Sequence, residues 1–143
     1  MIKVIAFDLN GVVFPTFSKL NSKVWGFIKD CKSLGYKVVV ASNSSKSAFE
    51  LRNKIFGLMN VFDGRIISSD LGYRKPEIQF FHEMVHILGC ESNEILFVDD
   101  SMENIVTANK VGIITVFFKN SESIDKIKDI LDNDRKRDST EIN

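Results

Sequence analysis

The sequence predicts an α/β fold in which a parallel sheet of five strands is covered by helices on both faces. Two observations favour it: short apolar runs recur along the chain, and segments with helical periodicity alternate with them. Unbroken apolar strands are typical of parallel sheets, because helices bury both faces of such sheets. A chain of 143 residues has the size of one domain. We expect residues 1–131 to form that domain and residues 132–143 a polar, frayed tail.

The five predicted strands are short apolar runs that end in polar residues. Val4–Phe7 is the first and ends at Asp8, and residues 38–41 form the second and end at Ser42-Asn43. The other three are residues 65–68, 94–98 and 113–118. Their lengths fit buried strands rather than helices.

The predicted helices carry apolar side chains three or four residues apart, the spacing that places them on one helix face. Residues 42–45 can cap the second helix, Pro76 opens the third, and Gly89 ends it. The apolar residues of the first three helices are Val24, Phe27, Ile28 and Cys31; Phe49, Leu51, Ile55 and Phe56; and Phe80, Phe81, Met84, Val85 and Leu88. The last two helices are residues 102–111 and 121–131.

Composition excludes several classes of protein. Nineteen basic and nineteen acidic residues cancel, so no net charge draws the chain to nucleic acid or to an anionic membrane. Cys31 and Cys90 form no CxxC pair, which argues against a disulfide scaffold or a thiolate metal site. No secretory signal or membrane span is visible, and we expect a cytoplasmic protein.

Polar side chains follow the predicted strands where ligands bind in parallel sheets, beyond the carboxyl ends. Asp8, Ser42 and the pair Asp99-Asp100 directly follow strands, and Lys75 lies in a loop of the same edge. Each could instead be a turn residue or a helix cap. Together they provide a nucleophile, oxygen ligands for Mg²⁺, and a cation and a hydroxyl to hold phosphoryl oxygens.

This set of residues resembles the haloacid dehalogenase (HAD) superfamily, whose four motifs occur here in order. They are Phe7-Asp8-Leu9-Asn10-Gly11-Val12-Val13, Val38–Val40 with Ala41-Ser42-Asn43, Arg74-Lys75-Pro76-Glu77-Ile78, and Phe97-Val98-Asp99-Asp100-Ser101-Met102-Glu103-Asn104. The stretch between Lys75 and Gly112 is most similar to subfamily I, which includes sugar-phosphate phosphatases. The resemblance implies a Rossmann-like three-layer sandwich with strand order 5-4-1-2-3.

The resemblance also implies roles for individual residues. Asp8 would be the nucleophile of a phosphatase and a Mg²⁺ ligand, and Asn10 would offer its backbone carbonyl to the metal. Asp100, directly, and Asp99, directly or through water, would complete the metal site. Four further residues have implied roles: Ser42 and Lys75 as catalytic phosphate ligands, with Asn43 beside them, and Asn104 behind the metal ligands.

Asn10 departs from the family, whose phosphatases carry an aspartate there as general acid and base. Loss of such a group typically slows a reaction by about 10²–10⁴-fold. The sequence therefore leaves two readings open, a slow Mg²⁺-dependent phosphohydrolase and a weakly active phosphate-binding or regulatory domain. Asn10-Gly11 is also prone to deamidation, which would restore an aspartate.

A cap domain is the second missing feature, because only thirty-odd residues separate Asp8 from Ser42, about the length of one helix and its loops. We therefore expect an open site. Open sites in this superfamily tend to serve large phosphorylated substrates or to take a lid from a neighbouring subunit. Phe14, Pro15 and Phe17 would form a short flap beside the site, where edge packing competes with substrate contact.

His82-Glu83-Met84-Val85-His86 matches the HExxH pattern of zinc peptidases. The third ligand of the extended pattern is missing, since Ser92 stands there, and both histidines fall on the polar face of a helix. A zinc peptidase is therefore a remote alternative. A dinucleotide-binding fold is disfavoured because no GxGxxG follows the first strand.

Overall fold

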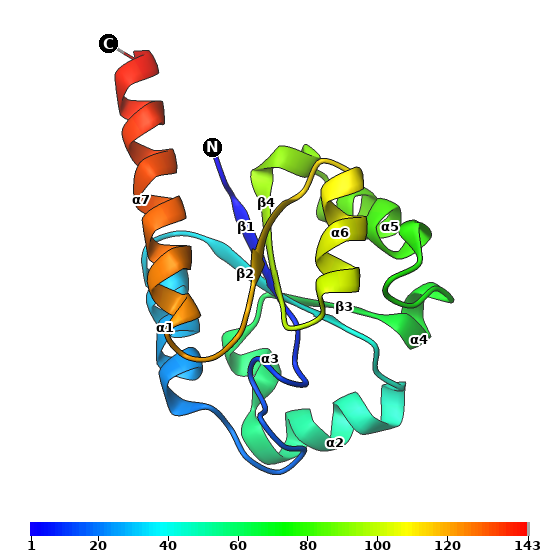
Figure 1. The fold of residues 1–143 in the computed structure, drawn as a ribbon. Coiled ribbons are helices and arrows are strands. Elements are labelled where there is room, and N and C mark those ends of the chain that lie inside the picture. The colour runs from blue at the N-terminus through cyan, green and yellow to red at the C-terminus, as the bar shows by residue number, and fades with distance from the viewer. Residues whose placement is uncertain (143) are drawn as a thin grey trace.

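The computed structural model describes residues 1–142 and confirms the predicted three layers, with a central sheet between two layers of helices (Figure 1). All five strands are parallel, in the order β3-β2-β1-β4-β5, which is the predicted order read from the opposite edge. The strands are β1 (Val4–Phe7), β2 (Lys37–Ser42), β3 (Gly64–Ile67), β4 (Ile95–Asp99) and β5 (Ile114–Phe117). The predicted fold class is therefore correct.

The register of the sheet brings the motif residues to one edge. Phe7 is paired with Val40 of β2 on one side and with Val98 of β4 on the other. The residues that follow on these three strands consequently lie side by side at the carboxyl ends. This is the edge at which parallel sheets bind ligands.

Two hydrophobic cores fill the space on either side of the sheet, because successive side chains of each strand point to opposite faces. Ile5 and Phe7 pack in the larger core, and Val4 and Ala6 pack in the smaller one. The larger core lies under α1 (Ser22–Ser33), α2 (Lys46–Phe56), α3 (Leu58–Val61) and α7 (Ser123–Ile142). The smaller core lies under α5 (Ile78–Leu88) and α6 (Met102–Lys110). Three short helices were not foreseen: α3, α4 (Ser68–Leu71) and the 3₁₀ turn Ser92–Glu94.

The last helix is longer than the sequence suggested. The expected frayed tail is wrong as far as Ile142, because α7 runs without a break from Ser123 to that residue and extends beyond the rest of the molecule (Figure 1). Two contacts fix its second half: Asp134 accepts a hydrogen bond from the Ile2 backbone N–H, and Arg135 donates one to the Tyr36 hydroxyl. The boundary between domain and tail at residue 131 stays a prediction.

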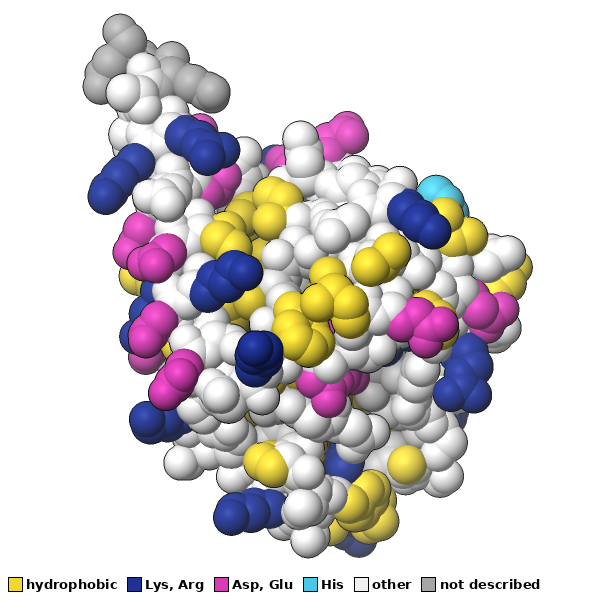
Figure 2. All heavy atoms as spheres, viewed as in Figure 1, with side chains coloured by type: hydrophobic (Ala, Val, Ile, Leu, Met, Phe, Trp, Pro, Cys, Tyr) yellow, Lys and Arg dark blue, Asp and Glu magenta, His cyan; other side chains and the backbone are white. Residues whose placement is uncertain are grey.

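Between β1 and α1 the chain makes a short loop and no cap domain, as the sequence predicted (Figure 1). Within residues 1–142, no helix has the length and apolar character that crossing a bilayer requires. Acidic and basic side chains are interspersed along α7 in Figure 2, so no field of one sign covers this helix.

Candidate active site

Asp8 lies at the centre of the carboxyl edge, immediately after β1. Its backbone N–H donates to the Val98 carbonyl, which continues the β1–β4 ladder and fixes the start of the loop. The side chain is buried, and its Oδ1 accepts hydrogen bonds from the Leu9 backbone N–H at 2.9 Å and from Lys75 Nζ at 3.0 Å. Within residues 1–142 no donor contacts Oδ2. One carboxylate oxygen is thus held in place, and the other is available as a nucleophile or a metal ligand.

Lys75 connects the three central strands through one ammonium group. Its Nζ donates to Asp8 Oδ1 at 3.0 Å, to Asp99 Oδ2 at 2.7 Å and to the Ala41 carbonyl at 2.8 Å. An ammonium has three protons, so these acceptors use its full capacity. Such charge-assisted bonds in a buried setting fix the cation next to the Asp8 carboxylate.

Asn43 positions the backbone of Lys75. Its side-chain amide makes a reciprocal pair, since Lys75 N–H donates to Asn43 Oδ1 at 2.8 Å and Asn43 Nδ2 donates to the Lys75 carbonyl at 2.9 Å. The loop after β2 and the loop before α5 are therefore joined at the point where Lys75 enters the site. This explains physically why an amide stands after Ser42.

Three carboxylates form an acidic cluster at the same edge. Asp8, Asp99 and Asp100 each offer an oxygen within 4.8 Å of the others, and no other group of this kind occurs in residues 1–142. Asp99 is fully buried, and it accepts hydrogen bonds from Lys75, from the Ser101 backbone and from Asn104. Asp100 is exposed to the cavity.

Gly11 makes room for the Asp100 carboxylate. Its backbone lies in the left-handed region, with φ at 87°, and a Cβ at this position would lie 2.0 Å from Asp100 Oδ2. A side chain is therefore excluded both by backbone strain and by overlap. The glycine after Asn10 is needed so that the two motif loops can approach.

Burial dominates the electrostatics of Asp8. Desolvation raises the pKa of its carboxyl from 3.8 to about 7, the Lys75 ammonium opposes this, and the carboxylates of Asp99 and Asp100 add to it. A bound divalent cation would act in the same direction as Lys75. The three carboxylates and one ammonium leave a net negative charge, which suits such a cation.

A cavity of about 290 Å³ opens over this cluster. The described residues that line it are Asp8, Asn10, Asn43, Lys75, Asp100 and Asn104. The structure thus brings together the predicted residues of all four motifs. Ser42 differs, because it is fully buried, its hydroxyl lies 2.7 Å from Ser44 Oγ, and Asn43 is the residue of that motif which lines the cavity. Its role as a phosphate ligand stays a prediction.

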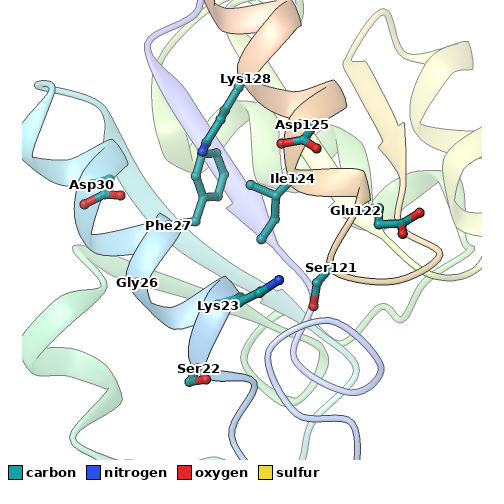
Figure 3. Close-up of a pocket in the computed structure, with 10 residues that line it drawn as sticks. All are labelled: Ser22, Lys23, Gly26, Phe27, Asp30, Ser121, Glu122, Ile124, Asp125 and Lys128. Atoms are coloured by element: carbon teal, nitrogen blue, oxygen red, sulfur yellow. The ribbon is translucent and has the colours of Figure 1, made fainter.

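A second cavity, of about 390 Å³, lies between α1 and the start of α7 (Figure 3). Lys23 and Lys128 line it together with Asp30 and Asp125, so both signs of charge are present. It contains no member of the acidic cluster. The residues that line each cavity, and not its size, identify the smaller cavity over the acidic cluster as the candidate active site.

The flap beside the site covers Arg52 of α2, a buried residue that the sequence did not reveal. Helix α2 was expected to bury Leu51 and Ile55, and this is wrong, because both are exposed and Arg52 is buried beside Phe49. The guanidinium carbon of Arg52 lies 4.4 Å from the centre of the Phe14 ring and 4.2 Å from that of Phe17. The available signal was an arginine at helical spacing from Phe49 and Phe56.

His82 and His86 lie on the exposed face of α5, as predicted. Neither belongs to the acidic cluster or to its cavity. The HExxH pattern therefore follows from helix surface composition, and α5 buries Phe80, Phe81 and Met84 instead.

Comparison with known proteins identifies the family. Residues 13–112 match the family described as haloacid dehalogenase-like hydrolase. The chain belongs to the haloacid dehalogenase-like hydrolases. Two relatives with reported activities are the sesquiterpene phosphatase of Aspergillus oryzae, 25% identical over 101 residues, and the glyceraldehyde 3-phosphate phosphatase of Methanothermobacter thermautotrophicus, 29% identical over 101 residues. These alignments cover 71% and 70% of this chain but 52% and 44% of the relatives, so the chain spans about half their length.

Solved HAD structures share the fold. A predicted HAD-like hydrolase from Porphyromonas gingivalis superposes with a TM-score of 0.77 at 19% identity, over 92% of this chain and 98% of that one. A HAD family enzyme from Bacteroides thetaiotaomicron, solved with magnesium and inorganic phosphate, gives 0.73 at 16% identity, over 83% of this chain and 95% of that one. The near-complete coverage of both chains shows that this architecture occurs in HAD proteins of similar size.

Proposed function

We propose that the protein is a Mg²⁺-dependent phosphohydrolase that acts through a phosphoaspartate on Asp8. The observation that carries this proposal is the arrangement of Asp8, which lines the cavity with its Oδ1 fixed by Lys75 and with no donor on Oδ2 within residues 1–142. The acidic cluster beside it supplies the oxygen donors that Mg²⁺ prefers. Phosphatase relatives and a structural neighbour with bound magnesium and phosphate support the assignment.

The donor set fits Mg²⁺. Asp8 and Asp100 would hold the ion with the backbone carbonyl of Asn10, and Asp99 would act directly or through water. The room that Gly11 leaves for the Asp100 carboxylate supports the same assignment. When bound, Mg²⁺ would draw charge from the phosphoryl oxygens and hold them next to the nucleophile.

Each of these residues has a separate role in the proposed reaction. An Asp8 oxygen attacks phosphorus, the bond from phosphorus to the leaving oxygen breaks, and that oxygen takes a proton. Lys75, with Ser42 and Asn43 assigned beside it, would stabilise the phosphoryl charge, and Asn104 keeps Asp99 oriented. Water then attacks the phosphorus of the aspartyl phosphate, which releases inorganic phosphate and restores Asp8.

Asn10 limits this scheme. An amide neither donates a proton to the leaving oxygen nor removes one from water, so both proton transfers fall to solvent. This observation favours a second candidate function, a phosphate-binding or regulatory domain with little turnover. The uncapped site fits either function, with a large phosphorylated substrate or a lid taken from a neighbouring subunit.

The test is release of phosphate from an aryl phosphate, with and without Mg²⁺. Asp8→Ala should remove metal-dependent turnover, because it removes the nucleophile. Asp30→Ala is the matched control, since it removes an exposed carboxylate that lines the other cavity. Turnover that survives both Asp8→Ala and removal of Mg²⁺ would exclude the proposal.

A further inference from the structure

Arg52 is a buried cation with unused hydrogen-bond donors. It lies in α2 with 3% of its surface exposed, and its Nε and Nη2 are buried without a hydrogen-bond partner within residues 1–142. A buried donor without a partner destabilises a fold, and more so when it is charged. Buried groups of this kind are rare enough in folded proteins to need an explanation.

The two aromatic rings do not satisfy these donors. Phe14 and Phe17 lie within 4.4 Å of the guanidinium carbon, at distances typical of cation–π contacts with the ring faces. An aromatic ring is a far weaker acceptor than an oxygen, so neither ring replaces a hydrogen-bond partner for Nε or Nη2. Phe17 is 51% exposed although it covers a charged group. The edge that carries Nε and Nη2 therefore still lacks a partner.

Arg65 shows what this edge binds elsewhere in the chain. Its Nε and Nη2, the same two atoms, hold the two oxygens of the Asp70 carboxylate at 3.0 and 3.4 Å. A planar fork of this kind matches carboxylate and phosphate oxygens. Arg52 offers the same fork, and its missing partner is an anion that the chain itself does not provide.

Arg52 is also connected to the reaction centre. Phe14, on which it packs, is fixed by two backbone hydrogen bonds, from its own N–H to the Leu9 carbonyl and from the Gly11 N–H to its carbonyl. Desolvation lowers the pKa of the Arg52 guanidinium, whereas the Asp8 carboxylate raises it. Arg52 therefore interacts electrostatically with the nucleophile and packs on a residue of the turn that follows it.

We propose that Arg52 binds a second anionic group of the phosphorylated substrate, while the first phosphoryl group occupies the Asp8 cavity. This inference rests on the proposed function and narrows its substrate class to compounds with two anionic groups. The second group enters at the exposed Phe17 side of the flap and is held by Nε and Nη2. It is a phosphoryl group or a carboxylate, since the fork binds both.

The test compares three probes by calorimetry at one fixed concentration of free Mg²⁺: inorganic phosphate, pyrophosphate and 3-phosphonopropionate. The variant is Arg52→Gln, and the matched control is Lys54→Gln, which removes an exposed cation from the same helix. We expect Arg52→Gln to weaken one or both of the two-anion probes by about tenfold or more, and phosphate by less than about threefold. Selective loss for pyrophosphate identifies a phosphoryl group, and selective loss for phosphonopropionate identifies a carboxylate.

Equal losses for all three probes, no loss for any, or the same loss in Lys54→Gln would overturn the proposal. If Arg52→Gln does not fold, Arg52→Lys replaces it, because it keeps the charge and removes the fork, and the same selective weakening is expected. Hydrolysis of an aryl phosphate by the native chain is measured in parallel. Selective binding without hydrolysis would reject catalysis and keep the Arg52 subsite, whereas hydrolysis without selective binding would do the reverse.

Discussion

Lys75 and Arg52 are equally buried cations on either side of the motif loop that begins at Asp8, and they differ in their partners. Each has 3% of its surface exposed. Lys75 uses all three ammonium protons on Asp8, Asp99 and the Ala41 carbonyl, whereas two nitrogens of Arg52 have no acceptor within residues 1–142. Burial alone therefore says little about a charged residue. The partners distinguish a cation whose donors are all used within the chain from one that keeps two donors without an acceptor within residues 1–142.

This difference has an energetic meaning. A buried charge network with every donor satisfied holds its geometry, and removing one member leaves the others uncompensated. Where a buried cation contacts only aromatic rings, replacing it by an apolar side chain of similar size should lower the free energy of unfolding only slightly. The predictions below test this contrast, from the largest expected effect to the smallest.

Replacing Lys75 by methionine should have the largest effect. It leaves Asp8 and Asp99 buried without their cation, so the free energy of unfolding should fall by about 3–5 kcal/mol. Metal-dependent turnover should disappear as well. Urea unfolding at pH 7.5 measures the first effect, and phosphate release measures the second.

Lys3→Met is the control for that experiment, because the Lys3 ion pair with Glu94 lies at the surface. Its loss should lower the free energy of unfolding far less than Lys75→Met does, because solvent screens a surface pair. Similar decreases in the free energy of unfolding for both variants would mean that the buried Lys75 network stabilises the fold no more than a surface ion pair does.

Asn10→Asp tests whether the site around Asp8 and Lys75 lacks only a group that transfers protons. Asn10 lines the cavity with Asp8 and Lys75, so an aspartate there could protonate the leaving oxygen and then activate water. We expect turnover of an aryl phosphate to rise by about 10²-fold or more. An unchanged rate would favour the regulatory function instead.

The intact mass of the native chain must be measured first. Deamidation of Asn10 adds about one dalton and would produce the same aspartate, which would mask the gain. Asn109→Asp is the matched control, because it makes the same change on α6, outside the residues that line the cavity. It should leave turnover unchanged.

The pH dependence of Mg²⁺ binding should follow the ionisation of the Asp8 carboxyl. Burial raises the pKa of Asp8 to about 7, so without metal its carboxyl is mostly protonated at pH 6 and ionised at pH 8. Mg²⁺ must displace that proton, and its affinity should therefore be about tenfold weaker at pH 6 than at pH 8. Calorimetry at the two pH values measures this, and Asp8→Asn should abolish most of the difference.

The same shift predicts how metal-free stability changes with pH. The folded protein holds a proton on Asp8 up to about pH 7, whereas an ordinary aspartate releases it near 3.8. The contribution of Asp8 to stability is therefore lost as the pH rises between these values. A contribution that grew over this range would contradict the raised pKa.

The sequence was informative where local pattern and topology agree. Apolar runs and the polar residues after them predicted the strands, and the parallel topology predicted that Asp8, Lys75 and Asp100 would meet. Pattern alone was insufficient for Arg52 and for the end of α7. Arg52 is buried by the flap, which is a contact between distant segments of the chain. The polar part of α7 is held through Asp134 and Arg135, which contact the body of the domain.

Arg52→Met should have the smallest effect on stability and is the sharpest test of the comparison. Methionine keeps an apolar side chain against Phe14 and Phe17 and removes the two unpaired donors. The cation–π attraction is lost, but the free-energy cost of burying unpaired donors is lost with it. We expect the free energy of unfolding to change by less than about 1 kcal/mol, against about 3–5 kcal/mol for Lys75→Met. Urea unfolding of both variants in one buffer gives the ratio directly. A loss of 3 kcal/mol or more in Arg52→Met, about the size expected of a paired ion, would show that the rings hold Arg52 as a structural cation and that no ligand is needed to explain its burial.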